Sequence, residues 1–314
     1  MNVLSADEVN DFLTMEETIR SIEQFYLDDS QGDMIMPDRM HIEDGANTSL
    51  LMPSYYGDYY ATKLVGVAPE NTSLGKPTIH GLMVLYSRKT MEPLLMCDAV
   101  PITALRTGAL GGLGMKYLAK QKASSLGIIG TGTQGWSHLQ SACAVRSIQT
   151  VHVYNRSQDK LEAFIKKARH AFPGLHIEKA SLENVVRQSD IIVTTTISEK
   201  PVLPELDPVS YKGKQIVGVG SFRPAMQEIP DSVLQQVDQV YVDAPSAFRE
   251  SGDMIRAREL GVDPEQTLSL KEIIERQHRP PQPEEQSIIF KSVGAAIFDL
   301  VVTKALYEKS AKRG

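Results

Sequence analysis

Short apolar runs alternate with amphipathic segments through most of the second half of the chain. The apolar runs are bounded by turn residues and lie at residues 125–129, 150–154, 175–177, 190–196, 215–220 and 239–243. Residues 158–170 and 182–187 show the spacing of apolar positions that is typical of helices. Alternating strands and helices indicate a parallel sheet with helices on both faces. The pattern therefore predicts an α/β domain with a doubly wound, Rossmann-type sheet over residues 118–291.

The first 117 residues have a different rhythm. A helix is expected near Met15 to Leu27, and strand-like segments follow at residues 48–52, 59–67, 78–86 and 93–97. Short polar turns join these segments, which is typical of an antiparallel meander. Pro101 then opens a helix that runs to about Lys120, since proline in a first turn gives up no hydrogen bond. We expect residues 1–117 to form a separate α+β domain.

The last apolar stretch, Val293 to Tyr307, predicts one more helix. Asp299 and Lys304 interrupt it, and it is too short to span a bilayer, so we interpret it as a buried helix. Residues 292–314 are expected to return to the first domain and complete it.

Composition and charge narrow the range of partners. The chain has 314 residues, is 42% hydrophobic and 23% charged, and carries a formal net charge of −6. This acidity argues against a nucleic-acid partner, because phosphates require a basic face. Cys97 and Cys143 are too few for a disulfide framework or a zinc cluster, so we expect core thiols and no metal. The N-terminal sequence lacks a signal pattern, and we expect a cytoplasmic protein that binds no membrane.

The run SLGIIGTGTQG at residues 125–135 is the most informative motif. It predicts a strand that enters a phosphate-binding turn, Gly130-Thr131-Gly132-Thr133-Gln134-Gly135, ahead of a helix. Gly130 would permit the tight turn, Gly132 would let the backbone approach a pyrophosphate, and Gly135 would allow the helix to pack closely on the strand. The helix N-terminus would supply N–H donors to the phosphates. The alternative is a glycine-rich turn without a ligand.

The second strand of this βαβ unit ends in Asn155-Arg156-Ser157, where the adenosine ribose of a dinucleotide should lie. An acid there would bind the ribose 2′-OH and repel a 2′-phosphate, whereas a guanidinium and a hydroxyl would bind that phosphate. The sequence therefore predicts NADPH rather than NADH as the cofactor. The alternative is an ordinary helix-capping turn with a solvated arginine.

Further motifs are spread along nearly the whole chain. They are Met36-Pro37-Asp38-Arg39, Leu51-Met52-Pro53, Lys63, Thr103-Ala104-Leu105-Arg106-Thr107, the GTGTQG turn, Gly220-Ser221-Phe222-Arg223-Pro224 with Glu228, and Phe290-Lys291-Ser292-Val293-Gly294. In this order and spacing they resemble the ornithine cyclodeaminase and mu-crystallin family. The resemblance implies a substrate-binding domain ahead of a Rossmann domain, a homodimer packed through the first domain, and a site in the cleft between the domains.

The resemblance also implies functional residues. Arg39, Lys63 and Arg106 would bind the substrate carboxylate, because guanidinium groups can grip a carboxylate with two parallel hydrogen bonds. The alternative for each is an ordinary solvated or structural basic side chain. Thr195 and Thr196 end a strand where a nucleotide should cross the sheet edge, although β-propensity alone also explains threonine there. The remaining cofactor contacts would come from the GTGTQG turn and from Thr78, Arg106, Ser292, Val293 and Gly294.

Local context supports two of these residues. The helix of Arg106 is rich in small residues, which indicates close approach of its backbone to a strand or a ligand. These small residues are Gly108, Ala109, Gly111, Gly112 and Gly114. Lys63 would lie between two guanidinium groups, which disfavour its charged form. We expect its ammonium to orient the carboxylate and to give a proton to the reacting nitrogen, which makes Lys63 the predicted catalytic residue.

The chain departs from the family pattern at two places. Phe222 stands where ornithine cyclodeaminases and related alanine dehydrogenases have an aspartate thought to be the catalytic base, and Leu50 stands where cyclodeaminases tend to have an acid. Oxidising an amino acid requires that base, whereas reducing a ready-made imine requires a bound carboxylate, a hydride donor and a proton. Mu-crystallin also lacks the aspartate and reduces cyclic ketimines. We therefore expect NADPH-dependent reduction of a small cyclic imine carboxylate whose ring methylenes pack against Phe222 and Leu50.

The leading substrate is Δ1-pyrroline-2-carboxylate, reduced to L-proline, and the six-membered Δ1-piperideine-2-carboxylate, reduced to L-pipecolate, is close behind. Other functions stay open. Ornithine cyclodeamination or amino-acid dehydrogenation would need a base from elsewhere, such as Asp243 or a water. A non-catalytic NADPH- or ligand-binding protein would keep the same motifs. An N-substituted amino-acid synthase would capture an imine formed from an amine and a 2-oxo acid.

Overall fold

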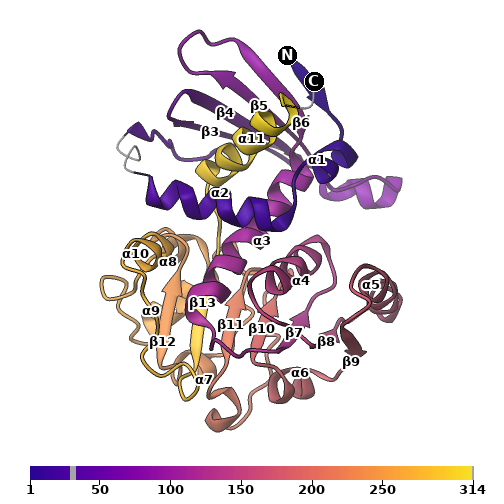
Figure 1. Cartoon of the computed structure of the whole chain (residues 1–314). Coiled ribbons are helices and arrows are strands. Elements are labelled where there is room, and N and C mark those ends of the chain that lie inside the picture. Colours follow the sequence, from indigo (N-terminus) through magenta and orange to yellow (C-terminus); the bar gives the residue numbers. More distant parts are fainter. Residues whose placement is uncertain (29–32, 313–314) are drawn as a thin grey trace. The chain divides into compact units, whose positions relative to one another are not determined.

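The protein divides into two compact units (Figure 1). The structure is a computed structural model that describes residues 1–28 and 33–312. The first unit is Met1–Arg106 with Ala295–Gly314, and the second is Thr107–Gly294. The helix α3 (Ala99–Leu118) belongs in part to each unit. The sequence analysis assigns a whole helix to one domain, so it places the domain boundary near the end of α3, after residue 117.

The first unit is built on an antiparallel meander, as predicted. Within the described residues its sheet has six strands in the order β1-β6-β5-β4-β3-β2. Their bounds are β1 (Asn2–Leu4), β2 (Met40–Asp44), β3 (Asn47–Tyr56), β4 (Tyr59–Val67), β5 (Ile79–Ser87) and β6 (Pro93–Asp98). The two edge strands, β1 and β2, were not expected from the sequence. β1 pairs with β6 in parallel, so its place depends on a partner far along the chain.

Helices cover one face of this sheet. They are α1 (Ala6–Phe12), α2 (Met15–Leu27) and α11 (Ala296–Ser310). A short 3-10 helix, η2 (Pro69–Leu74), connects β4 to β5 in the sequence. α11 packs against α2 and against β3, β4 and β5, so the C-terminal helix completes the first unit as predicted (Figure 1). Ser5 and Thr14 begin α1 and α2 with capping boxes, which explains where these helices start.

The opposite face of the sheet exposes apolar side chains. Strand register aligns Met40, Leu51, Leu64 and Leu82 in one row across β2, β3, β4 and β5. Met40 is 57% exposed, Leu64 39% and Leu82 46%. A row of exposed apolar side chains of this kind is a candidate surface for association with another protein.

The second unit is an open parallel sheet with helices on both faces, which confirms the predicted fold class. Within the described residues it has seven strands in the order β12-β13-β11-β10-β7-β8-β9, and all neighbours are parallel. The strands are β7 (Ser125–Ile129), β8 (Thr150–Tyr154), β9 (His176–Lys179), β10 (Ile191–Thr194), β11 (Gln215–Gly218), β12 (Gln239–Val242) and β13 (Ile288–Lys291). The helices are α4 (Thr133–Val145), α5 (Gln158–Ala171), α6 (Leu182–Gln188), α7 (Asp231–Leu234), α8 (Ala247–Glu250), α9 (Gly252–Glu259) and α10 (Leu270–Glu275), with the 3-10 helix η3 (Pro208–Tyr211).

The order of the strands locates a ligand site. β7 lies between β8 and β10, so the chain winds outward in opposite directions from β7. In open α/β sheets, ligands bind at the carboxyl ends of the strands at this switch point. β13 lies between β11 and β12 and was not expected as a strand. Its four residues follow a proline-rich loop, and the sequence analysis assigns no element to them.

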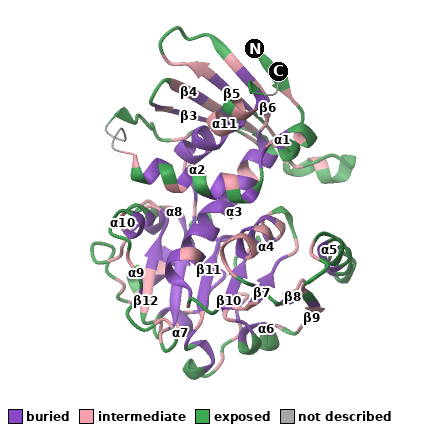
Figure 2. Cartoon of the chain, viewed as in Figure 1, coloured by how far each residue is buried: buried purple, intermediate pink, exposed green. Residues whose placement is uncertain are grey.

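Glycines in α3 let side chains of the second unit approach its backbone. A Cβ on Gly111 would lie 2.4 Å from Nε2 of His138, and one on Gly114 would lie 2.4 Å from Cδ1 of Phe290. Both partners are fully buried, and α3 is largely buried in Figure 2. The small residues of this helix therefore serve close packing, as the sequence indicated. Burial lowers the pKa of His138 to about 4, so its ring is neutral.

Neither cysteine has a disulfide partner. Cys97 is buried, and burial raises the pKa of its thiol to about 12. Cys143 is only partly buried, so the prediction of a core thiol is correct for Cys97 and too strong for Cys143. Within the part of the chain that the structure describes, none of the helices has the length and apolar character needed to cross a membrane.

Candidate active site

Lys63 lies on the covered face of the first unit's sheet. Register pairs it with Met52 of β3 and Met83 of β5, and its side chain points toward α11. Lys63 is 3% exposed. Its Nζ donates a hydrogen bond to Oδ2 of Asp299 over 2.7 Å. Asp299, in the first turn of α11, is fully buried.

The same carboxylate binds Arg106. Nε of Arg106 lies 3.3 Å from Oδ1 of Asp299, and the arginine is 8% exposed. Nη1 of Arg106 is buried and has no hydrogen-bond partner among the described residues. Arg39, which precedes β2, is partly buried and close enough for its charge to act on Lys63. The three predicted cations are therefore brought together in the first unit.

The pKa of Lys63 is lowered, in the direction expected from the sequence. Burial is the largest cause, and the charges of Arg106 and Arg39 add to it. The negative charge of Asp299 opposes them. The sequence argument named only the two arginines, so it missed both the larger cause and the counter-ion. The available signal was a single acid within an apolar stretch that predicts a buried helix.

These contacts leave a set of unused donors. An ammonium has three N–H groups, and among the described residues Lys63 uses one of them, on Asp299. Nη1 of Arg106 adds a buried donor that has no acceptor among the residues that the structure describes. A buried donor that lacks a partner is costly, and an anion with two oxygens would satisfy several such donors at once. The group is suited to a carboxylate.

Leu50 and Phe222 were predicted to contact the substrate ring. Leu50 is partly buried in β3, and strand alternation places it on the same sheet face as Met52 and Lys63. Phe222 follows β11 in the second unit and is 42% exposed. The guanidinium of Arg223 lies 5.5 Å from the centre of its ring. The ring-binding role of both residues stays a prediction.

The glycines of the dinucleotide turn have the geometry that the sequence required. Gly130 has a φ of +104°, which side chains disfavour, and a Cβ there would lie 2.8 Å from Oγ1 of Thr195. A Cβ on Gly135 would lie 2.1 Å from the carbonyl oxygen of Gly130, so α4 can pack on the turn only with glycine. No described atom lies within 4 Å of a Cβ on Gly132, which leaves open space for a ligand to reach the backbone.

The start of α4 offers donors for an anion. Gly132 occupies the N-cap and Thr133 is the first helical residue, with no side-chain capping bond from the described residues. Oγ1 of Thr131 is buried and has no partner in the part of the chain that the structure describes. A helix N-terminus with free N–H groups and an unsatisfied hydroxyl fits a pyrophosphate. Gln134 is partly buried and accepts hydrogen bonds from Ser137, in the first turns of the helix.

Asn155, Arg156 and Ser157 lie at the end of β8, where the sequence left two interpretations open. Oδ1 of Asn155 accepts a hydrogen bond from the Thr131 backbone N–H over 3.3 Å, which joins this segment to the glycine turn. Ser157 occupies the N-cap of α5, yet its hydroxyl makes no capping bond within the described residues. Arg156 is exposed. A simple capping turn lacks its defining hydrogen bond here, and two groups suited to phosphate are left available.

Glu228 organises the carboxyl ends of β10 and β11. Its carboxylate is fully buried and accepts hydrogen bonds from the Thr194 and Thr196 hydroxyls and from the Thr196 and Gly220 backbone N–H groups, at 2.6–2.9 Å. Burial is the largest cause that raises its pKa. Thr195 donates to the Gly130 carbonyl over 3.0 Å. The two predicted cofactor threonines therefore belong to a built network at the sheet edge, which β-propensity alone does not explain.

The segment of Ser292, Val293 and Gly294 is held by Asp243. Oδ2 of Asp243 accepts from the Ser292 hydroxyl and from the Val293 and Gly294 backbone N–H groups, at 2.7–2.9 Å. Asp243 is buried and serves this turn, which weakens the alternative in which it is a catalytic base. Thr78 lies in the first unit, just before β5, and its carbonyl accepts from Ala68 N–H.

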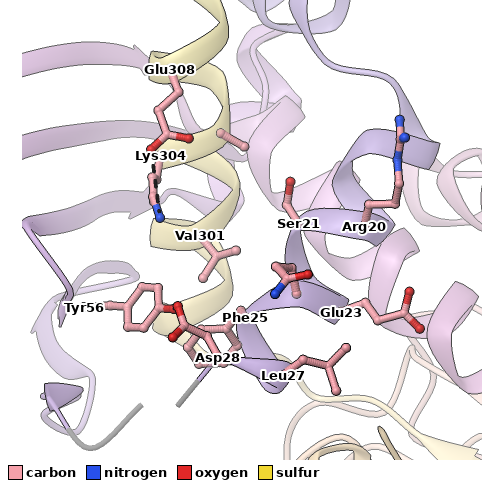
Figure 3. A pocket seen from close by; sticks show the side chains of 12 residues that line it. Arg20, Ser21, Glu23, Phe25, Leu27, Asp28, Tyr56, Val301, Lys304 and Glu308 are labelled. Carbon is pink, nitrogen blue, oxygen red and sulfur yellow. Dashed lines mark hydrogen bonds and ion pairs between the residues drawn. The ribbon is translucent and has the colours of Figure 1, made fainter. Parts of the chain in front are cut away.

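A separate hollow of about 410 Å³ lies in the first unit between α2 and α11. Figure 3 shows its lining, which includes Asp28, Tyr56, Lys304 and Glu308. The Tyr56 hydroxyl donates to Asp28, and Lys304 lies 3.9 Å from Glu308. Because these polar groups already pair with one another, the hollow is less suited to binding an anion than the surroundings of Lys63 and Arg106.

The sequence profile of the ornithine cyclodeaminase/mu-crystallin family matches residues 1–314. The protein belongs to this family. One relative, a Delta(1)-pyrroline-2-carboxylate reductase of Bacillus cereus, is 36% identical, and the match covers 100% of this chain and 98% of the relative.

Solved structures of the ornithine cyclodeaminase/mu-crystallin family share the fold. The Thermococcus litoralis Delta(1)-pyrroline-2-carboxylate reductase in complex with NADH and L-proline is 31% identical with a TM-score of 0.91, covering 100% of this chain and 98% of that one. An archaeal alanine dehydrogenase dimer with bound NAD is 29% identical with a TM-score of 0.90, covering 100% and 97%. The family resemblance inferred from the motifs is confirmed.

Proposed function

We propose that the protein catalyses NADPH-dependent reduction of a small cyclic imine carboxylate, with Δ1-pyrroline-2-carboxylate to L-proline as the leading reaction. Δ1-piperideine-2-carboxylate, giving L-pipecolate, is the second substrate. The observation that carries the proposal is the buried donor set of Lys63 and Arg106 around Asp299. Full-length similarity to Delta(1)-pyrroline-2-carboxylate reductases supports the same reaction.

Each residue has a role in this chemistry. Arg39, Lys63 and Arg106 hold the carboxylate and orient the ring. A bound reduced nicotinamide supplies a hydride to the imine carbon. Lys63 gives a proton to the ring nitrogen as the C=N bond becomes a single bond. Leu50 and Phe222 present apolar surface to the ring methylenes.

The second unit would hold the dinucleotide. The pyrophosphate would lie on the turn of Gly130 to Gly135 and the N-terminus of α4, with the edge of Thr195, Thr196 and residues 292–294 beside it. Thr78 and Arg106 of the first unit complete the proposed cofactor contacts. Arg156 and Ser157 would bind a 2′-phosphate, which favours NADPH over NADH.

Oxidative reactions are disfavoured by the lack of a suitable base. Ornithine cyclodeamination and alanine dehydrogenation require a group that takes a proton from the substrate ammonium. Phe222 has no such group, and Asp243 accepts three hydrogen bonds from the segment of residues 292–294. A purely ligand-binding protein would use the same buried donor set around Asp299, so turnover of the imine is what separates the two functions.

We also propose a cytoplasmic homodimer. The exposed apolar row of Met40, Leu64 and Leu82 is the surface through which two copies would meet. The archaeal alanine dehydrogenase of the family was solved as a dimer. Two free cysteines are compatible with a reducing compartment.

The test is NADPH oxidation with a panel of cyclic imine acids, with ornithine, lysine and alanine assayed in the oxidative direction. We expect turnover with the five- or six-membered imine and none with the amino acids. Lys63→Met should abolish turnover while NADPH binding, followed by the fluorescence of the reduced nicotinamide, stays intact. Ammonia release from ornithine, or full activity of Lys63→Met, would reject the proposal.

A further inference from the structure

Asp299 binds two members of the cation group, which consists of Arg39, Lys63 and Arg106. The proposed mechanism gives Asp299 no role. Asp299 stands 236 positions from Lys63 in the sequence and 193 from Arg106. Oδ2 accepts from Lys63 over 2.7 Å and Oδ1 accepts from Arg106 over 3.3 Å, so each carboxylate oxygen holds one cation. The carboxylate therefore fixes both side chains relative to one another.

Stability alone is a weak reason for this acid. A buried ion pair often stabilises a fold no more than apolar side chains of similar volume would, since desolvation offsets the attraction. Asp299 is fully buried in α11 between Phe298 and Leu300, which are buried as well. Apolar side chains in place of the acid and both cations would suit these surroundings as well. Its place between two cations with unused donors indicates a role in what those donors bind.

We propose that Asp299 is a positioning residue: it orients Lys63 and Arg106 so that their remaining N–H groups face the substrate carboxylate, and it keeps Lys63 protonated. The inference rests on the proposed reduction of an imine carboxylate. Both oxygens of Asp299 are occupied, so its remaining influence on the substrate passes through Lys63 and Arg106.

The charges around Lys63 define the expected effect. The groups that act on it are Asp299 from α11, Arg106 from α3 and Arg39 from the segment before β2. Burial and the two arginines lower the pKa of Lys63, while Asp299 raises it. Asp299 is thus the counter-charge that lets a buried lysine carry a proton to the reacting nitrogen.

Asp299→Asn tests this role, because it keeps the size of the side chain and removes the charge. Its amide NH2 must face Lys63 or Arg106, both of which are donors. Without the negative charge the pKa of Lys63 falls, so the alkaline limb of the kcat/KM profile should move to lower pH by about one to three units. The KM for the imine should rise about tenfold or more, and the affinity for L-proline, measured by calorimetry, should fall with it.

Glu17→Gln is the matched control. Glu17 of α2 pairs with Lys309 of α11, the helix that also carries Asp299. Nζ of Lys309 donates to Oε2 of Glu17 over 2.7 Å, within the first unit but apart from Lys63 and Arg106. The Glu17→Gln variant should lose some thermal stability and keep the wild-type pH profile and the wild-type KM for the imine. A merely structural Asp299 would behave like Glu17, with lower stability and an unmoved alkaline limb, and that result would overturn the inference.

A second variant covers the case in which Asp299→Asn does not fold. Asp299→Glu keeps the charge and displaces the carboxylate, so a raised KM with the alkaline limb near its wild-type pH supports positioning. Wild-type KM in Asp299→Glu contradicts it. If the wild-type enzyme reduces no imine acid, the proposed function has failed; if it reduces one and both Asp299 variants match it, only the role of Asp299 has failed.

Discussion

We propose that Arg156 and Ser157 select the dinucleotide through charge and hydrogen bonding. Arg156 is exposed at the end of β8, and the Ser157 hydroxyl makes no capping bond within the described residues. A 2′-phosphate would gain charge-assisted hydrogen bonds there, whereas a bare 2′-hydroxyl would gain little.

Arg156→Ala should raise the KM for NADPH about tenfold or more and leave the KM for NADH nearly unchanged. Steady-state kinetics with both cofactors measures this. Lys166→Ala, which removes an exposed cation from α5, the helix that follows Arg156, should change neither value. An NADH preference in the wild-type enzyme would rule out the assignment.

Some candidate residues could be named from the sequence. The three glycines of the turn follow from their local spacing, whereas Lys63 and Arg106 follow from the family resemblance. Asp299 could not be named as one, because its role comes from a contact across 236 positions. Glu228 was noticed only as part of a motif, since its four hydrogen-bond donors come from two other strand ends.

At the level of elements, the sequence predicts a helix or strand well when its apolar periodicity extends over many residues or when clear turn residues bound it. The meander β3–β6, the unit β7–α4–β8 and the helix α11 follow this rule. β1 and β13 have three and four residues, and they exist because partners lie ready to pair with them in parallel. β1, with three residues, is too short to show a period, whereas β13 is as long as the predicted strands β10, β11 and β12.

Helix α3 gives a direct test of packing. A Cβ on Gly114 would lie 2.4, 2.7 and 2.8 Å from three atoms of the buried Phe290 ring. Gly114→Ala should therefore destabilise the protein by about 1–3 kcal/mol, although alanine favours a helix. Urea unfolding measures the change in free energy.

Two companion variants make the Gly114 result specific. Gly174→Ala places a Cβ where no described atom lies within 4 Å, so its effect should be small. Adding Phe290→Leu to Gly114→Ala should recover part of the loss, because the smaller side chain can move. Unchanged stability in Gly114→Ala would mean that the ring has room and that the glycine serves another purpose.

At the scale of the whole molecule, we propose that the first unit binds the substrate carboxylate, that the second binds the dinucleotide, and that the exposed apolar row of the first unit is the association surface. Leu64 lies in the centre of the exposed apolar row. Leu64→Glu should convert a dimer into a monomer, because burying a carboxylate in an apolar interface is costly. Sedimentation or light scattering reports the mass.

Leu74→Glu serves as the control for the association surface. Leu74 is 67% exposed in η2, away from the row, and the variant should remain dimeric. A monomeric wild-type protein, or a dimer that survives Leu64→Glu, would place association elsewhere.

The most direct test of the proposed reaction follows the hydride itself. The enzyme is incubated with Δ1-pyrroline-2-carboxylate and NADPH that carries two deuterium atoms at C4 of the nicotinamide, and the product is analysed by mass spectrometry. We predict L-proline that carries one deuterium at its α carbon. Failure to form proline with this cofactor, or proline without the label, would contradict hydride transfer to a cyclic imine.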